Sequence, residues 1–280
     1  MEYFYTSEPG AGLAAASAPA LFVSHGAPSV LLEEDGFNAS LAAFGKKYRP
    51  SAIVAVSAHW LTEGAVEVTA VAGNNATIHD FSGFPKALYG MEYPAPGSEW
   101  LARTAAELLG AKNVAVTLNH ARGLDHGAWV PLTIMYPEKN IPVVQVSIPW
   151  PSTPEMLYAM GEALRPLRAD GVLLVGSGAM THNLSLPVWA SKEAAPLKEA
   201  AAFDAWVTAR VQDRNLAELF EYLPLAPHAA AMHPAADHFL PLFFTLGCAR
   251  DEDRLETVFE GFHYAALSMR SFVFTAAENG

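Results

Sequence analysis

Short apolar runs alternate with amphipathic stretches along the chain, which predicts strands alternating with helices. The runs expected to be strands are 20–24, 52–58, 65–71, 113–118, 142–148 and 171–176. Several are continuously apolar, as is typical of strands buried on both faces. Helices are expected at 38–48, 98–109, 154–169, 192–211 and 237–246. This alternation predicts an α/β fold with a central, mostly parallel (mixed) β-sheet covered by helices on both faces.

Residues typical of helix ends support two of these helices. Ser98 is expected to cap the start of one helix, and Gly110 to follow its end. Asp237 is the expected N-cap of the last helix, which places His238 in its first turn and Gly247 at its end. The loosely alternating segment 257–274 is expected to return as one or two late strands.

Composition indicates one globular domain. Hydrophobic residues make up 51% of the 280 residues and charged residues 16%, which favours a large buried core. No repeat, charge block or long linker divides the sequence, so one catalytic domain is expected at 20–280, after a flexible N-terminal extension at 1–19. The state of oligomerisation is left open, with a homo-oligomer as one possibility.

The charge and the single cysteine narrow the partners and the compartment. The net charge is −12 and no cluster of lysine and arginine occurs, which disfavours nucleic acid and anionic membranes as partners. No apolar run approaches the roughly 20 residues that span a bilayer. Cys248 has no second cysteine to pair with, which is typical of a reducing compartment. A cytoplasmic location is therefore expected.

Histidines stand where predicted strands end. His25 follows the strand 20–24, His59 follows the strand 52–58, and His182 comes shortly after the glycine-rich end of a third strand. Ligands of open α/β sheets bind outside the carboxyl ends of the strands. A lone histidine there is often a turn or core residue, but matched histidines from separate strands predict a metal site at that edge of the sheet, and a metal site suggests an enzyme.

Further candidate residues lie outside the strands. His238 is expected to supply a third metal ligand, with His233 and Asp237 as rivals. His182 is suited to be an acid/base residue or a fourth ligand. His126 is either a donor to a metal-bound oxygen or simply a loop histidine.

The loop from 73 to 98 is long for a connection within a compact domain, and loops of this length are more often functional than not. Its aromatic residues, including Phe81, and the pair His79 and Asp80 are expected to wall a pocket for a planar substrate.

Other catalytic motifs do not fit the sequence. The chain has neither a Gly-x-Ser-x-Gly nucleophile elbow nor a His-Glu-x-x-His helix. The Gly176-Ser177-Gly178 segment lacks the lysine and the glycine spacing of phosphate-binding loops. Cys248 lies in an apolar stretch with no histidine beside it, and is expected to be inert.

Seven short motifs, in this order, resemble the DOPA-dioxygenase branch of the class III extradiol ring-cleaving dioxygenases. They are LFVSHGAP at 21–28, SAHW at 57–60, TIHDFSGFP at 77–85, YPAPGS at 93–98, GLDHG at 123–127, GAMTHNL at 178–184 and DHFLPL at 237–242. The similarity runs from about residue 20 to the end of the chain.

The resemblance implies a non-haem Fe(II) enzyme that uses O₂ to open a catechol ring beside its two hydroxyls, giving a muconic semialdehyde. The matching positions imply His25, His59 and His238 as metal ligands. They imply His182 as the acid/base residue, and His126 as a histidine beside the metal that is not itself a ligand.

Alternatives remain for the metal, the substrate and the class of protein. The wider superfamily commonly uses two histidines and a glutamate, so Asp237 as a ligand would restore the usual facial triad. Three neutral imidazoles suit Zn(II) as well as Fe(II), and zinc could occupy the purified protein.

A zinc-dependent hydrolase or a non-catalytic metal- or peptide-binding protein on the same fold are the competing hypotheses. The expected substrate is a single-ring catechol such as DOPA or caffeate, with Arg122 or Lys86 as counter-charge for an acidic side chain.

Overall fold

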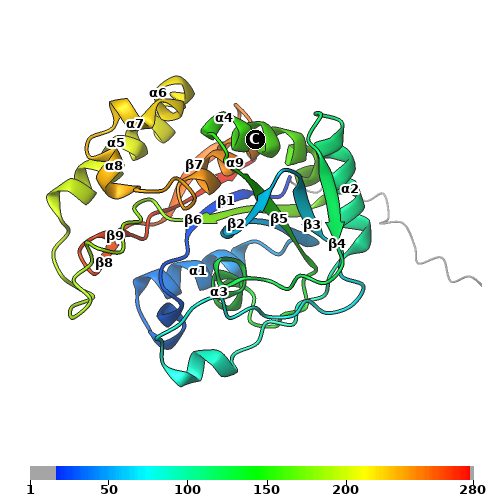
Figure 1. Ribbon diagram of the computed structural model, residues 1–280, viewed down its shortest axis with the longest axis horizontal. Coiled ribbons are helices and arrows are strands. Elements are labelled where there is room, and N and C mark those ends of the chain that lie inside the picture. The colour runs from blue at the N-terminus through cyan, green and yellow to red at the C-terminus, as the bar shows by residue number, and fades with distance from the viewer. Residues whose placement is uncertain (1–16, 278–280) are drawn as a thin grey trace, which may run out of the picture.

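The central feature is a mixed sheet of eight strands in the order β4-β3-β5-β2-β6-β1-β10-β7, seen in a computed structural model that describes residues 17–277 (Figure 1). The strands are β1 (Ala20–Ser24), β2 (Ala52–Glu63), β3 (Val66–Thr69), β4 (Val116–Asn119), β5 (Val143–Trp150), β6 (Val172–Gly178), β7 (Arg254–Phe259) and β10 (Ser271–Thr275). The four central strands β5, β2, β6 and β1 are parallel, whereas β3 and β10 run antiparallel to their inner neighbours. A separate hairpin pairs β8 (Phe262–His263) with β9 (Leu267–Ser268).

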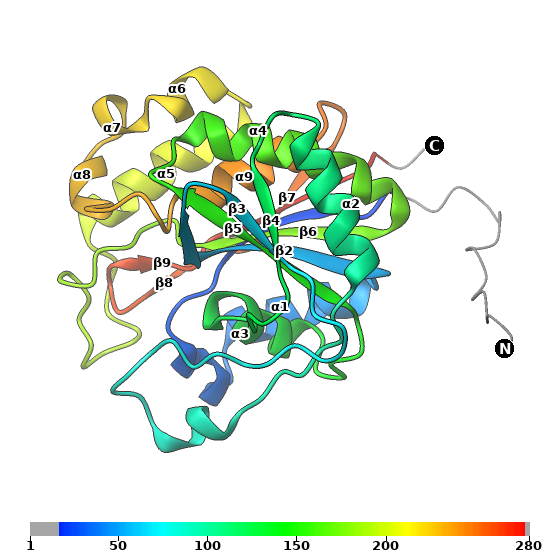
Figure 2. The ribbon, with the colours of Figure 1, turned by 45° about the vertical axis from the view of Figure 1, so that its right-hand side comes forward.

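Helices cover both faces of this sheet, which confirms the predicted fold class (Figure 2). One face is covered by α2 (Glu99–Gly110), α4 (Pro154–Leu164) and α9 (Leu240–Cys248), and the other by α1 (Gly36–Lys47) and α3 (His126–Met135). Beside the first layer lie α5 (Lys198–Gln212), α6 (Leu216–Phe220), α7 (Tyr222–Leu225) and α8 (Ala229–Met232). Short 3₁₀ helices span Pro28–Leu32, Lys86–Gly90 and Arg165–Asp170.

The core explains why the central strands are continuously apolar. Successive side chains of a strand point to opposite faces, so in β1 Phe22 packs into the core under α9 while Leu21 and Val23 pack into the core under α3. All three are fully buried. Every position of such a strand therefore needs an apolar side chain, and the crossover connections leave the carboxyl ends of β1, β2 and β6 together at one edge.

Two expected helices are shorter than their patterns suggested, and proline is the reason in both. The helix predicted at 154–169 ends at Leu164 and continues as a 3₁₀ helix containing Pro166. The helix predicted at 192–211 begins only at Lys198, after Pro196. Proline has no backbone N–H to donate, so it cannot continue the hydrogen bonding of an α-helix.

Of the three predicted helix-end residues, one has the expected role and two do not. Ser98 is the N-cap of α2, and its side chain accepts a hydrogen bond from the Leu101 N–H at 3.2 Å, as expected. Gly110 is instead the last residue of that helix. Asp237 does not cap α9, which starts at Leu240, so the expectation that His238 lies in the first helical turn is wrong.

The outermost parts of the chain are only partly described. Of the expected N-terminal extension, residues 1–16 lie outside the described residues. Ala18 is buried, and its N–H donates to the carbonyl oxygen of Arg168 at 2.8 Å. Across 17–277, no helix combines the length and the apolar character that crossing a membrane requires.

Candidate metal and substrate site

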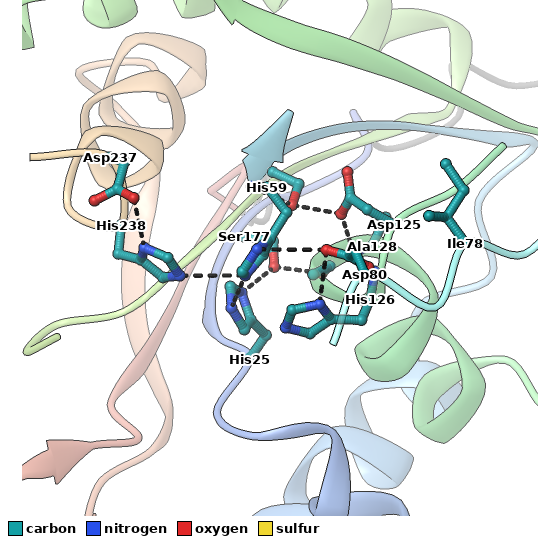
Figure 3. Close-up of polar contacts among 12 residues, drawn as sticks. His25, His59, Ile78, Asp80, Asp125, His126, Ala128, Ser177, Asp237 and His238 are labelled. Atoms are coloured by element: carbon teal, nitrogen blue, oxygen red, sulfur yellow. Dashed lines mark hydrogen bonds and ion pairs between the residues drawn. The ribbon is translucent and has the colours of Figure 1, made fainter. Parts of the chain in front are cut away.

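Three histidine side chains converge at the carboxyl edge of the sheet (Figure 3). His25 directly follows β1, His59 lies within β2, and His238 lies in the turn that leads into α9. The Nε2 atom of His59 is 3.1 Å from Nε2 of His25 and 3.2 Å from Nε2 of His238. The structure thus brings together the three residues that the sequence proposed as metal ligands.

The spacing of these nitrogens suits a shared metal ion. With metal–nitrogen bonds of about 2.0–2.1 Å, two imidazole nitrogens lie about 2.9 Å apart at a right angle and about 3.4 Å apart at a tetrahedral angle. The two observed separations fall between these values. The donor set therefore fits a single first-row metal ion.

The other ring nitrogen of each histidine faces an oxygen. Nδ1 of His25 lies 2.9 Å from Oγ of Ser177, which itself donates to the carbonyl oxygen of Gly127. Nδ1 of His59 lies 3.5 Å from a carboxylate oxygen of Asp80, and Nδ1 of His238 lies 3.2 Å from one of Asp237. The contact at His25 is a hydrogen bond, whereas the two carboxylates are near Nδ1 of His59 and His238 as ion-pair contacts. An oxygen near Nδ1 favours the proton there, which leaves the Nε2 lone pair for a metal.

Two glycines, Gly26 and Gly178, allow the close backbone packing that positions His25 and His238. Gly26 adopts a left-handed conformation with φ of +65°, and a Cβ there would lie 2.6 Å from Cε of Met269. At the end of β6, a Cβ on Gly178 would lie 2.2 Å from the carbonyl oxygen of His238. That oxygen accepts a hydrogen bond from the Ala179 N–H at 2.8 Å, which joins the turn to the sheet.

His59 is placed by an irregularity in β2. The pairing of β2 with β5 shifts register between Val56 and Leu61, so the strand is bulged around His59. A bulge of this kind re-aims a side chain, and bulges are frequent beside functional sites. The strand therefore does not end at His59, as the sequence suggested, but bends there and continues to Glu63.

His126 is the first residue of α3 rather than a loop residue, and Asp80 fixes its ring. Asp125 caps the helix by accepting from the Ala128 N–H. The Asp80 carboxylate accepts from the His126 N–H at 2.8 Å and contacts Nδ1 at 2.9 Å. Burial alone would raise the pKa of Asp80, but the hydrogen bonds and charge of His126 outweigh it and lower the pKa to about 2.

Burial favours the neutral form of four histidines at the site by lowering their pKa. Burial, reinforced by neighbouring imidazoles, holds the pKa of His25 and of His238 well below the ordinary value. Burial likewise lowers the pKa of His59 to about 3. His182 lies flat against His238, with ring centroids 3.4 Å apart and an angle of 3° between the planes, and burial lowers its pKa too.

These side chains open onto a cavity of about 270 Å³. The histidines, Asp80 and Phe81 line it, together with Phe84, Leu184 and Trp189. A cavity that joins an apolar wall to a few convergent polar groups is typical of sites for small molecules.

Some sequence candidates lie elsewhere. His79 is not among the residues that line the cavity, and its Nε2 lies 2.9 Å from the carbonyl oxygen of Met91 within the long loop. His233 is buried and contacts the carbonyl oxygen of Met180 at 2.9 Å. Asp237 lies at the Nδ1 side of His238, away from the nitrogens that converge (Figure 3). The rivals for the third ligand thus do not reach the cluster of Nε2 atoms.

Neither expected counter-charge lines the cavity. Arg122 instead donates to the Asp125 carboxylate at 3.2 Å and to the carbonyl oxygen of His59 at 3.4 Å, and stacks on the ring of Trp60. Lys86 is exposed at the start of a 3₁₀ helix. The buried Cys248 has a raised pKa because of desolvation, in keeping with an inert thiol.

Sequence reasoning missed several residues of the site. Ser177 was considered only as part of a glycine-rich segment, and its contact with His25 depends on the pairing of β1 with β6. Leu184 ends the GAMTHNL motif but was given no role, and Trp189 carried no signal in the irregular segment between β6 and α5. The GLDHG motif around His126 was the available clue to the helix that presents it.

Fold and site together define a metal-dependent α/β enzyme that acts on a small molecule. Residues 19–275 match the family described as the catalytic LigB subunit of aromatic ring-opening dioxygenase, and the chain belongs to this family. It is therefore an extradiol aromatic ring-opening dioxygenase, which displaces the competing hypotheses of a hydrolase and a non-catalytic binding protein.

Individual relatives agree with this assignment. The chain is 38% identical over 263 residues to a 4,5-DOPA dioxygenase extradiol from Beta vulgaris, covering 91% of this chain and 96% of the relative. It is 39% identical over 257 residues to the protein of that name from Escherichia coli K12, covering 90% and 93%. A crystal structure of an uncharacterized protein from Escherichia coli K12 is similar, with a TM-score of 0.77, 34% identity and coverage of 91% and 99%.

Proposed function

We propose that this dioxygenase opens the ring of a single-ring catechol with O₂ to give a muconic semialdehyde, with Fe(II) held by His25, His59 and His238. The observation that supports the proposal most strongly is the convergence of three Nε2 atoms, each with an oxygen at its Nδ1, on one edge of the cavity. Bound there, Fe(II) would supply the redox chemistry of O₂ and acidify the catechol hydroxyls.

Iron is favoured over zinc by the chemistry rather than by the ligands. Three imidazoles suit either metal, but Zn(II) has no redox chemistry to offer a dioxygenase. We therefore expect zinc to bind competitively at the same site and to give an inactive protein.

His182 and His126 are the residues proposed to handle protons. His182 lines the cavity beside His238, so its neutral imidazole is placed to accept a proton from a catechol hydroxyl and return it to the product. Because Asp80 holds Nδ1 of His126, the Nε2 lone pair of His126 is left to accept a hydrogen bond from the substrate.

The wall of the cavity supports binding of a planar ring. Phe81 lies next to His126 at a steep angle, with ring centroids 5.7 Å apart, and presents an aromatic surface beside the site. We propose that Phe81 contacts the substrate ring and that Asp80 acts through His126 and His59. His79 is proposed to act without touching the substrate, by fixing the loop that carries Asp80 and Phe81 through its contact with the Met91 carbonyl.

The proposal is tested by loading the protein with Fe(II) without air, then adding catechols and air. Stoichiometric uptake of O₂ and a yellow semialdehyde are expected, and a zinc-loaded sample is the control. If O₂ is not consumed across a panel of charged and uncharged catechols, despite one bound iron per chain, the proposed function is wrong.

A further inference from the structure

One wall of the cavity belongs to a segment with little buried surface of its own. Residues 183–197, called here the wall segment, connect β6 to α5 and carry the lining residues Leu184 and Trp189. None of residues 184–196, all of which the structure describes, is buried. Leu184 is 56% exposed and Trp189 52% exposed, so both lie where the cavity meets solvent. Such a segment depends on a few polar contacts to keep its place.

On one side the wall segment is joined to the hairpin of β8 and β9, beside which it runs in Figures 1 and 2. The Val188 N–H donates to the carbonyl oxygen of Tyr264 at 2.8 Å, and the Tyr264 N–H donates to that of Lys192 at 2.8 Å. The rings of Trp189 and Tyr264 pack with their centroids 5.1 Å apart. Because β9 also lines the cavity, the hairpin and the wall segment form one side of it together.

On the other side Lys192 reaches from the wall segment to the stretch of chain that follows β1. Its ammonium group contacts the carboxylates of Glu33 and Asp35. Glu33 directly follows the 3₁₀ helix whose first residue, Pro28, lines the cavity, and Asp35 is the N-cap of α1. Lys192 thus links two walls of the cavity through residues that lie 157 positions apart along the chain.

This cluster of three charges is partly shielded from solvent. The side chains of Lys192, Glu33 and Asp35 are 19%, 23% and 19% exposed. Salt screens partly buried charges less than exposed ones, and a network of charges contributes more than an isolated surface pair. Burial alone would lower the pKa of Lys192, but hydrogen bonds to the two carboxylates outweigh it and raise the pKa. Lys192 therefore keeps its charge at neutral pH.

We propose that Lys192 is a positioning residue, which clamps the wall segment across the cavity. The clamp holds Leu184 and Trp189 against the ring substituent of the catechol, at the end of the cavity that faces solvent. The inference rests on the proposed function and deepens it by assigning one wall of the cavity to recognition of the substituent. Lys192 is not among the residues that line the cavity, so it acts only through the segment. Without the clamp the catechol oxygens keep their contacts, whereas the substituent loses those with the wall.

The kinetic test compares Lys192→Met, which keeps the length of the side chain but not its charge, with Lys192→Arg, which keeps the charge. Both iron-loaded full-length proteins are assayed by O₂ uptake with unsubstituted catechol and with the best substituted catechol of the panel. Lys192→Met is expected to raise KM about tenfold for the substituted compound and less than about twofold for catechol, because losing one apolar contact in a pocket typically costs about that much. Unchanged kcat and bound iron, and parental values in Lys192→Arg, would support the role. An equal rise in both KM values, or no rise, would overturn it.

Limited digestion with chymotrypsin tests the clamp without relying on catalysis. The protease cuts after the leucines and Trp189 of the wall segment when the segment opens locally, so the rate reports how often it does. Lys192→Met is expected to speed the first cut within 183–197 about tenfold, and Glu33→Gln, which leaves one carboxylate, by less.

The matched control is Lys47→Met, since Lys47 contacts Glu256 at 3.5 Å in a more exposed pair and does not line the cavity. It is expected to be digested like the parent. A parental rate in Lys192→Met, or a first cut outside the wall segment, would overturn the clamp. If the parent consumes no O₂ with any catechol, the proposed function is wrong, and the digestion alone decides whether Lys192 holds the segment.

Discussion

Replacing Ser177 with alanine is expected to damage metal binding through a residue that does not touch the metal. The Ser177 side chain is fully buried, lies 2.9 Å from Nδ1 of His25 and donates to the carbonyl oxygen of Gly127. Alanine leaves the His25 N–H and the Gly127 carbonyl without partners. Two buried unsatisfied groups cost about 2–6 kcal/mol of unfolding free energy, and each kcal/mol lowers Tm by roughly 2–4 °C.

The effect on the metal is separate from the loss of stability. Without an acceptor at Nδ1, His25 is free to move its proton to Nε2 and to rotate, and losing such a partner typically weakens metal affinity by about 10–100-fold. The matched control is Ser57→Ala, since Ser57 pairs with Ser177 across β2 and β6 and is equally buried. Its hydroxyl donates to Asp125 and accepts the backbone N–H of His59, but contacts no ring nitrogen of a proposed ligand. The assay is competition for metal against a chelator of known affinity. Metal affinity of Ser177→Ala equal to that of Ser57→Ala would refute this reasoning.

Three further predictions concern other parts of the structure. His182→Ala is expected to keep its metal but lose about 10²–10⁴-fold in turnover, since one positioned acid/base contributes that much; metal analysis beside O₂ uptake measures both, and parental turnover would remove the role. Asp253→Asn removes the charge that faces the fully buried Arg168 and is expected to lower the unfolding free energy by about 3–5 kcal/mol in urea titration; a loss below about 1 kcal/mol would contradict this. Burial alone would raise the pKa of Asp35, but hydrogen bonds from Lys192 and the Asn38 N–H outweigh it, so the net shift is downward from 3.8. The stability that Asp35 contributes is therefore present above pH 3.8 and lost as the pH falls through the lower folded pKa, and Asp35→Asn should flatten the dependence of Tm on pH in that window.

The sequence was most informative where burial leaves few choices. The strand β1 is apolar at nearly every position, so the run stands out in the sequence. Its end, and the histidine that follows, could therefore be located from the residues alone. The helix α3 shows the opposite case. It is buried almost all round and contains Pro131, so it has neither an amphipathic period nor the composition of a helix. The helix that presents His126 was therefore not predicted.

The partners of individual polar side chains were also beyond the sequence, even where the partners are close along the chain. Asp237 fits the pattern of an N-cap, but its carboxylate instead faces Nδ1 of His238. Arg122 was expected to face an acidic group of the substrate, but Asp125, three residues along the chain, accepts its hydrogen bond instead. The partner that each of these side chains contacts depends on distances and angles that only the folded chain sets.

The positions of the three proposed ligand histidines have a consequence for how the enzyme would acquire its metal. His25 and His59 are made early in synthesis, whereas His238 follows only near the other end of the chain, and its turn is joined to β6 through Ala179. A partly synthesised or truncated chain would therefore present at most a two-histidine site. Capture of the metal would be deferred until the turn that carries His238 has joined β6, and a bound ion would then link distant parts of the chain and add its binding free energy to that of folding.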